Sequence, residues 1–258
     1  MTAISSHFMT ILYLKVLIKL ENSYSYDSIK NNLAVITENI NEAVLKYRSS
    51  GTKVSIMAVT KTVPAEVVNW VFDWGLDLLG ENRVQEFLSK KDVYLNRTPA
   101  GQAPEIHFIG HLQTNKVKYI INDVNMIQSV DSVKLAAEIN RLAKANNKVM
   151  DILCEVNIGG EDSKSGVSPD ELGSLLDALA PMENINIRGL MTIPPPTDSD
   201  IFLGRMGELY NKLRDEKHEG ISMDILSMGM THDYSDAVRF GSNLVRIGSG
   251  LFGARNYV

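Results

Sequence analysis

Apolar positions along the chain follow a helical period first and then fall into short runs. From Ser28 onward they recur every three or four residues, which predicts one apolar stripe on a long helix. The stripe consists of Ile29, Leu33, Ile36, Ile40 and Val44. The apolar runs that follow predict strands at residues 54–61, 77–82, 105–110, 125–132, 150–159, 185–194, 222–230 and 243–253. Strands with so few polar positions are typical of a parallel sheet that is covered on both faces.

Amphipathic segments separate these runs. The helices that they predict begin near Pro64 or cover residues 129–147, 168–180 and 197–219. We expect Ser168 to cap the third of these helices, with Pro169 at its first position. The long segment 197–219 is predicted to be an outer helix of the scaffold.

Strand and helix alternate eight times after one leading helix, which favours a single α/β domain, a (β/α)8 TIM barrel, over an open doubly wound sheet. The length of 258 residues fits such a barrel. We assign residues 25–258 to this domain because no linker or change in composition divides them.

Residues 1–24 form an atypical N-terminal extension. Its apolar stretch 8–20 is interrupted by Lys15 and Lys19 and is shorter than the roughly 20 residues of a membrane helix. It lacks the basic start and the cleavage site of a signal peptide. We expect an additional strand or helix against the barrel or a poorly ordered segment, with Met9 as an alternative start.

Composition narrows the function classes. The net charge of −5 argues against nucleic acid and against an anionic membrane as partners. The one cysteine, Cys154, lies in an apolar run, and we interpret it as a small buried hydrophobe rather than a nucleophile. A chain with one cysteine forms no internal disulfide, which suits a reducing compartment, so we expect a cytoplasmic protein.

Lys61 closes the first apolar run, "VSIMAVTK". Side chains alternate along a strand, so Met57, Val59 and Lys61 share one face, and Lys61 is expected to point into the barrel mouth. Desolvation there lowers the pKa of a lysine and yields an amine that can condense with a carbonyl. The alternatives are a lysine that reaches solvent or one that pairs with an acid such as Glu81.

Two glycine-containing turns follow the last two predicted strands. "GSGLFG", from Gly248 to Gly253, has the spacing of a dinucleotide-binding motif, but too few residues follow it to complete that unit. A strand that enters a short helix through Gly248 and Ser249 suits a phosphate group instead. "SMGM", from Ser227 to Met230, supplies a second turn of this kind. Glycines that serve only the turns are the alternative.

Arg246 lies in the otherwise apolar segment "LVRIG". A buried arginine requires an acceptor, which can be an acid such as Asp224 or a ring nitrogen of a bound heteroaromatic molecule. A carbonyl-trapping lysine, a phosphate site and an arginine for a ring nitrogen together describe pyridoxal 5′-phosphate.

The segments "AVTKTVP", "GENRVQE", "HFIGHLQTNK", "GLMTIP", "SMGMTHDYSDAV" and "GSNLVRIGSGLFGAR" resemble the pyridoxal phosphate homeostasis protein family. The resemblance covers residues 28–256 in order and implies the barrel of alanine racemase. It departs from the family pattern in residues 1–24 and at Arg83, where many relatives carry tyrosine.

The resemblance implies the roles of the site residues. Lys61 would form the Schiff base and Asn82 would contact the cofactor near its phenolic oxygen. Arg246 would face the pyridine nitrogen. The phosphate side would be formed by Ser227, Gly229, Met230, Gly248 and Ser249.

Function divides into three hypotheses. A charged arginine at the ring nitrogen disfavours its protonation and makes the ring a weak electron sink. A racemase needs two acid/base groups, of which Lys61 could be one. The resemblance to alanine racemase implies that the other would be a tyrosine from a separate domain and a partner subunit, and we expect no such domain in this chain. We therefore expect a non-catalytic protein that buffers pyridoxal phosphate or delivers it to apo-enzymes, as a monomer or weak homodimer. The alternatives are a low-activity racemase or lyase and a lysine-dependent aldolase with a phosphorylated substrate.

Four further side chains receive a weaker interpretation. His107 and His111 are expected on one face of a strand, and we favour packing and hydrogen bonds over metal binding. Lys164 lies in the polar loop "GGEDSKSG" on the rim of the barrel, where it is either a solvated lysine or a transient acceptor of the aldehyde. His232 receives no role.

Overall fold

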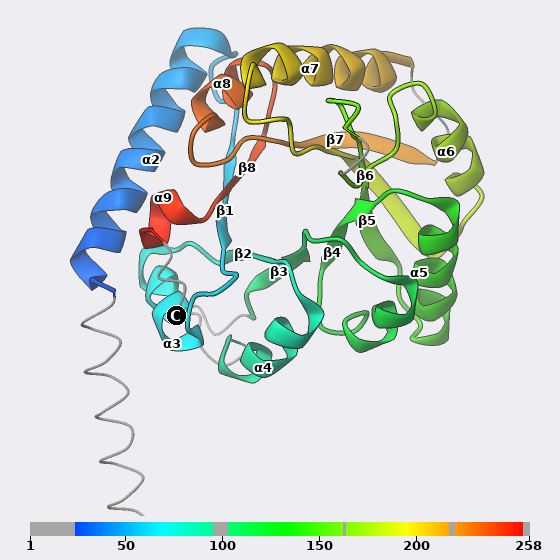
Figure 1. The fold of residues 1–258 in the computed structure, drawn as a ribbon, viewed down its shortest axis with the longest axis horizontal. Helices are drawn as coiled ribbons and strands as arrows, with labels where there is room; N and C mark the ends of the chain where they lie inside the picture. Colours follow the sequence, from blue (N-terminus) through cyan, green and yellow to red (C-terminus); the bar gives the residue numbers. More distant parts are fainter. Residues whose placement is uncertain (1–23, 95–102, 162–163, 217–219, 255–258) are drawn as a thin grey trace, which may run out of the picture.

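Eight parallel strands close into a barrel in chain order in the computed structural model, which describes residues 24–94, 103–161, 164–216 and 220–254 (Figure 1). The predicted fold class is therefore confirmed. The strands are β1 (Ser55–Val59), β2 (Leu78–Glu81), β3 (Glu105–Phe108), β4 (Met126–Val130), β5 (Met150–Glu155), β6 (Ile185–Met191), β7 (Ile221–Ser227) and β8 (Leu244–Ile247).

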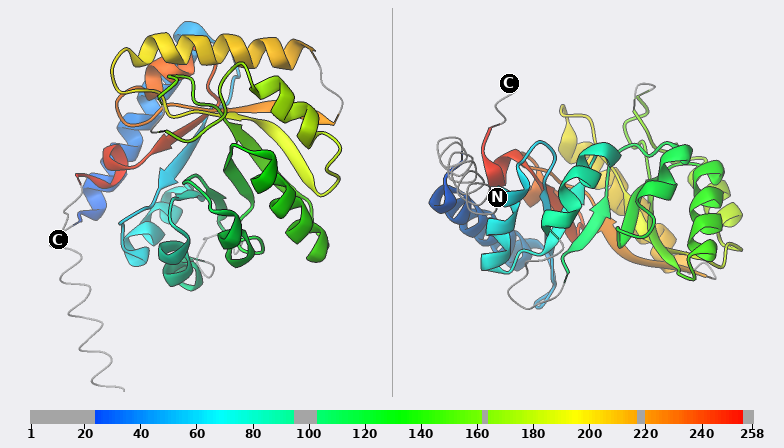
Figure 2. Two further views of the ribbon diagram at one scale, coloured as in Figure 1. Left: turned by 45° about the vertical axis from the view of Figure 1, so that its right-hand side comes forward. Right: turned by 90° about the horizontal axis from the view of Figure 1, so that it is seen from below.

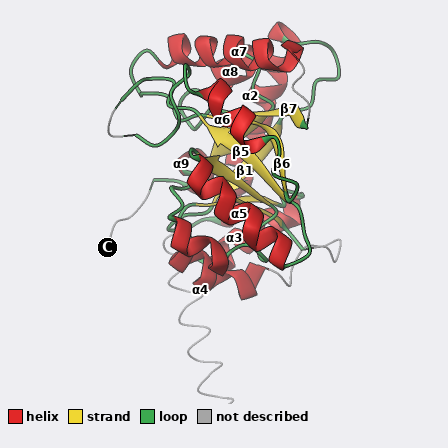
Figure 3. Cartoon of the chain, turned by 90° about the vertical axis from the view of Figure 1, so that its right-hand side faces the viewer, coloured by secondary structure: helices red, strands yellow, loops and turns green. Residues whose placement is uncertain are grey.

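Helices surround the barrel on its outside (Figures 2 and 3). They are α2 (Tyr26–Tyr47), α3 (Ala65–Val68), η1 (Asn69–Trp74), α4 (Val84–Tyr94), η2 (Thr114–Tyr119), α5 (Val133–Ala145), α6 (Leu172–Leu179), α7 (Ser199–Glu216), α8 (Tyr234–Arg239) and α9 (Ser249–Phe252). The leading helix α2 buries Ile29, Ile36 and Ile40 on the predicted stripe.

Helix starts follow local capping. The side chain of Ser25 accepts from the N–H of Ser28 at the start of α2, and Ser132 caps α5 in the same way. The predicted start of α6 at Ser168 is wrong, because the helix begins at Leu172. Ser168 Oγ and the Glu171 carboxylate instead close a turn ahead of the helix at 2.6 Å.

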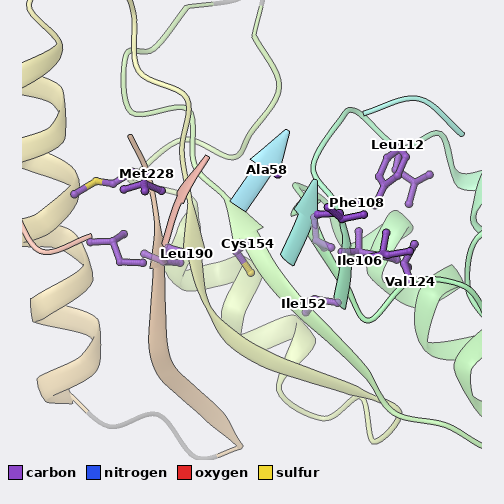
Figure 4. Packing of buried hydrophobic residues seen from close by; sticks show 14 of the residues in the cluster. Ala58, Ile106, Phe108, Leu112, Val124, Ile152, Cys154, Leu190 and Met228 are labelled. Atoms are coloured by element: carbon purple, nitrogen blue, oxygen red, sulfur yellow. The ribbon is translucent and has the colours of Figure 1, made fainter. Parts of the chain in front are cut away.

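Two apolar layers lie on the two sides of the sheet. The layer between strands and helices is the larger and includes Ala58, Ile106, Phe108, Leu112, Val124, Ile152, Cys154, Leu190 and Met228 (Figure 4). Inside the barrel, Met57, Val59 and Ile109 form one small cluster, and Met126 and Leu153 belong to another. Closure of the barrel buries both faces of the strands over most of their length, which explains the nearly continuous apolar runs of the sequence.

The apolar stretch 8–20 of the predicted extension lies outside the described residues. In the part of the chain that the structure describes, no helix has the length and apolarity required to cross a membrane.

Candidate functional site

A cavity of about 190 Å³ opens at the carboxyl ends of the strands. Active sites of (β/α)8 barrels form at this end, because the loops that follow the strands converge there. The residues that line it are Val59, Lys61, Asn82, Ile109, Ile193, Met230, Thr231, His232, Arg246, Gly248 and Ser249. Six of the eight predicted cofactor-binding residues are among them: Lys61, Asn82, Met230, Arg246, Gly248 and Ser249.

Lys61 lies in the turn after β1 rather than within the strand, which ends at Val59. The alternation predicted for this segment is confirmed: Met57 and Val59 pack inside the barrel, whereas Ala58 packs toward the helices. Lys61 continues the inner face and lines the cavity together with Val59.

Glu81 is on the other side of the sheet from the cavity. Its carboxylate accepts hydrogen bonds from Thr60 Oγ1 at 2.6 Å and from the Tyr94 hydroxyl at 2.9 Å. Burial raises the pKa of Glu81, and the nearby Lys90 opposes this shift. The acid proposed as a partner for Lys61 thus serves the packing of β2 against α4.

The turns after β7 and β8 lie against each other at one side of the cavity. The N–H of Gly250 donates to Thr231 Oγ1 at 3.0 Å, and Thr231 Oγ1 lies 3.4 Å from Ser249 Oγ. The N–H of Met230 donates to Asp233 Oδ1 at 2.6 Å, which fixes the first turn. Gly248 and Ser249 open α9 beside them, so small residues and helix-start N–H groups meet in one place, as a phosphate site requires.

Two predicted residues lie behind the cavity wall rather than in it. Gly229 has a φ of +96°, and a Cβ there would lie 2.5 Å from Ala237 Cβ on α8. This glycine therefore permits the turn to pack on α8. Ser227 is fully buried beneath the cavity, where its hydroxyl contacts Arg246.

Arg246 forms part of the cavity floor and is 3% exposed. Its guanidinium donates to Ser227 Oγ and to the carbonyl oxygen of Thr192, both at 2.7 Å. Burial lowers the pKa of Arg246 to about 10, and Glu155 and Asp233 oppose this shift. The side chain thus remains a cation at neutral pH.

The alternative in which Arg246 pairs with Asp224 is wrong. Ser227 pairs with Leu244 across β7 and β8, so Arg246 lies above this level and Asp224 below it. The two residues are separated by about 16 Å along the strands, at about 3.3 Å per residue. Asp224 binds Arg188 instead, with Nε–Oδ1 and Nε–Oδ2 distances of 3.1 and 3.0 Å.

Glu155, at the carboxyl end of β5, was not among the predicted site residues. The side chain is 6% exposed, and burial raises its pKa to about 7, with Asp131 adding to the shift and Arg246 opposing it. The available signal was an acid at the end of the apolar run "DILCE", at the edge where barrel sites form. His232, which received no role, also lines the cavity.

The two histidines of the segment "HFIGH" lie in different environments. His107 and His111 do not share a strand face, because β3 ends at Phe108. His107 is buried between Gln128 and Glu105, whereas His111 is exposed, with Nδ1 3.3 Å from Ser165 Oγ.

The two other rim residues are exposed. Arg83 directly precedes α4 and accepts the N–H of Phe87 through its carbonyl oxygen. Lys164 pairs with Glu161 at 3.3 Å in the loop after β5.

Comparison with known proteins identifies the relatives of the chain. The family model "Alanine racemase, N-terminal domain" matches residues 31–256. A pyridoxal phosphate homeostasis protein of Aquifex aeolicus is 41% identical over 233 residues, which span 87% of this chain and 97% of the relative. The corresponding protein of Pasteurella multocida is 36% identical over 235 residues, 89% of this chain and 99% of the relative.

Comparison with solved structures gives relatives of the same kinds. PipY of Synechococcus elongatus with pyridoxal phosphate bound superposes with a TM-score of 0.73 at 26% identity, covering 87% of this chain and 100% of PipY. Alanine racemase of Clostridium difficile shares the fold, with a TM-score of 0.68 at 19% identity over 90% of this chain and 58% of the racemase.

Proposed function

The chain belongs to the pyridoxal phosphate homeostasis protein family, and on that premise we propose that it binds pyridoxal 5′-phosphate at Lys61 and buffers or delivers it without a catalytic cycle of its own. The observation that carries this proposal is the convergence of Lys61, Arg246 and the Gly248–Ser249 turn on one cavity.

The residues of this cavity suit the cofactor chemically. Bound pyridoxal phosphate supplies an aldehyde that reacts with amines and a pyridine ring that can accept electrons. The neutral amine of Lys61 would attack the aldehyde carbon, and loss of one water would leave a Schiff base between them. Gly248, Ser249 and Thr231 would bind the phosphate, and Asn82 would orient the ring from the end of β2.

Arg246 supports storage over catalysis. Its acceptors, Ser227 Oγ and the Thr192 carbonyl oxygen, are neutral, so no hydrogen-bonded carboxylate cancels its charge. A ring nitrogen facing this cation would gain a proton only at a cost, and an unprotonated ring stabilises a carbanion weakly. Holding the aldehyde does not require that stabilisation.

A PLP-dependent enzyme with weak racemase or lyase activity is the second candidate. His232 lines the cavity and is a titratable group that could exchange a proton with an amino acid. Repeated turnover of an amino acid that disappears in both Lys61→Ala and His232→Asn would favour this candidate over storage.

The test of the storage proposal is borohydride reduction of protein loaded with pyridoxal phosphate, followed by peptide mapping. We expect one reduced adduct at Lys61, lost in Lys61→Ala and kept in Lys212→Ala, whose side chain is exposed on α7. An adduct spread over surface lysines, or none, would refute the proposal.

Delivery is tested by mixing loaded protein with an apo-enzyme and a scavenger of free pyridoxal phosphate. Transfer that resists the scavenger supports handover, and Lys164→Ala tests whether the rim lysine takes part. We further propose a cytoplasmic protein, because a single cysteine suits a reducing compartment, and we propose a monomer or weak homodimer.

A further inference from the structure

A chain of hydrogen bonds crosses the barrel interior from the floor of the cavity to the opposite end. Arg246 Nη1 donates to Ser227 Oγ at 2.7 Å, and Ser227 Oγ donates to Gln128 Oε1 at 2.7 Å. Gln128 Nε2 lies 2.8 Å from His107 Nδ1, and His107 Nε2 lies 2.8 Å from Glu105 Oε1. We call Glu105, His107, Gln128 and Ser227 the relay.

The residues that form these hydrogen bonds differ in how deeply they are buried. Ser227 and Gln128 are 0% exposed, His107 is 2% exposed and Arg246 is 3% exposed. The side chain of Glu105 is 56% exposed, at the amino end of β3. The relay therefore connects a cation in the cavity with a carboxylate that contacts solvent at the other end of the barrel.

Arg246 dictates the direction of every bond in the relay. A guanidinium only donates, so Ser227 Oγ must accept from it and can donate its single hydrogen to Gln128 Oε1. The amide of Gln128 then presents Nε2 to His107, whose Nδ1 must accept. His107 consequently carries its proton on Nε2 and donates to the Glu105 carboxylate. This hydrogen bond lowers the pKa of Glu105.

A purely structural network is the simpler explanation of these contacts. Barrel interiors are usually filled by branched apolar side chains, which pack without a desolvation cost. Here two fully buried polar side chains extend from the cavity arginine, and each hydrogen bond depends on the orientation of the next group. The arrangement fixes the Nη1 side of the guanidinium, in addition to the hydrogen bond that Nη2 donates to the Thr192 carbonyl oxygen, and apolar side chains in the same space would leave Nη1 without an acceptor.

We propose that the relay positions Arg246 for the ring of bound pyridoxal phosphate, so that Gln128 and His107, which are not in the cavity wall, are positioning residues for its retention. This inference rests on the proposed function. A cut in the relay at Gln128 removes the acceptor that orients the Ser227 hydroxyl, so Arg246 Nη1 is held less firmly while Nη2 keeps its hydrogen bond to the Thr192 carbonyl oxygen. Part of the ordering of the guanidinium must then occur at each binding event, which weakens binding.

The first test uses the apo-protein and does not depend on cofactor binding. Nitrogen NMR of labelled histidine should show His107 as the neutral tautomer with its proton on Nε2. In Gln128→Leu that preference should be lost, and the side-chain signals of Arg246 should broaden or shift. His107 with its proton on Nδ1 in the wild type would overturn the relay, whatever the protein binds.

The second test measures the release of pyridoxal phosphate by its absorbance after dilution. We expect release to be about tenfold faster in Gln128→Leu, a factor equal to about 1.4 kcal/mol. Glu105→Gln keeps a hydrogen-bond acceptor but loses the charge, so we expect a smaller acceleration of about twofold to threefold. This exposed position should also tolerate the change if Gln128→Leu does not fold.

Tyr210→Phe is the control for lost stability. It removes the buried hydrogen bond from the Tyr210 hydroxyl to the Met223 carbonyl oxygen, between α7 and β7 and outside the relay. Release at the wild-type rate is expected in this variant. If Glu105→Gln and Gln128→Leu also release at the wild-type rate, the relay is only structural. If the wild type binds no pyridoxal phosphate, the proposed function fails while the NMR result stands.

Discussion

From the buried carboxyl of Glu155 we predict an unusual dependence of stability on pH. Its carboxyl is buried at the end of β5, and its pKa rises from the ordinary 4.5 to about 7. In the folded protein it therefore keeps its proton at pH values where the unfolded chain has released it. The contribution of Glu155 to the free energy of unfolding therefore falls as the pH rises from about 4.5 to about 7, and it is fully lost above that range.

The magnitude follows from the size of this shift. A change of pKa from 4.5 to about 7 corresponds to about 3 kcal/mol, at about 1.4 kcal/mol for each tenfold change in proton affinity. Glu155→Gln removes the titration and keeps the shape of the neutral acid. The variant should thus gain up to about 3 kcal/mol over the wild type between pH 5 and pH 8, a large part of the stability of a typical domain.

Chemical denaturation of the apo-protein at several pH values measures this difference. The comparison between variant and wild type cancels the titrating groups that do not interact with Glu155; Asp131, which adds to the shift of Glu155, is not one of these. Glu138→Gln is a control of opposite sign, because Arg141 lowers the pKa of Glu138 and its contribution is lost on acidification. A stability difference between Glu155→Gln and the wild type that stays constant or shrinks as the pH rises would refute the reasoning.

Three further predictions concern the site and the fold. Arg246→Gln should release pyridoxal phosphate about tenfold faster because one charge-assisted contact is lost, whereas Arg214→Gln, which alters a partly exposed arginine on α7, should leave the release rate unchanged. Gly229→Ala should lower the free energy of unfolding by about 3 kcal/mol or more, because the added Cβ meets Ala237 and the backbone has a positive φ. Gly51→Ala has a φ of +83° but open space around it, so the same denaturation assay should show only the backbone cost of about 1 kcal/mol. Cys154 should react with a thiol reagent only after unfolding, because burial raises its pKa to about 12; prompt modification of the native protein, followed by absorbance, would contradict this.

Local patterns predicted the parts of the fold that depend on near neighbours in sequence. Alternation along β1 was enough to separate Met57 and Val59 from Ala58 and to direct Lys61 toward the cavity. The stripe on α2 was equally local. The start of α6 was missed because Ser168 and Pro169 are also good turn residues, and the sequence does not distinguish a helix cap from a preceding turn.

Contacts across the barrel could not be predicted in this way. Ser227 and Gln128 are 99 residues apart in sequence, and their strands are not neighbours in the sheet. Whether two such side chains meet depends on strand tilt and register, which are properties of the closed barrel. The same limit explains why Asp224 was proposed for Arg246, whereas Glu155 had a local signal at the end of its apolar run and was overlooked.

Glu155 and the relay both act on Arg246, Glu155 through its charge and the relay through hydrogen bonds. The relay supplies neutral acceptors, Ser227 and Gln128, so it orients Arg246 without cancelling its charge. Glu155 is the carboxyl with the largest opposing effect on the pKa of Arg246, yet its own pKa of about 7 leaves it substantially protonated at neutral pH. A ring nitrogen beside Arg246, as we propose, would therefore face a cation whose charge Glu155 and Asp233 offset only in part. An acid at this nitrogen would favour its protonation and strengthen the ring as an electron sink, whereas an arginine does not. These charges consequently favour an aldehyde that is held at Lys61 and left chemically quiet.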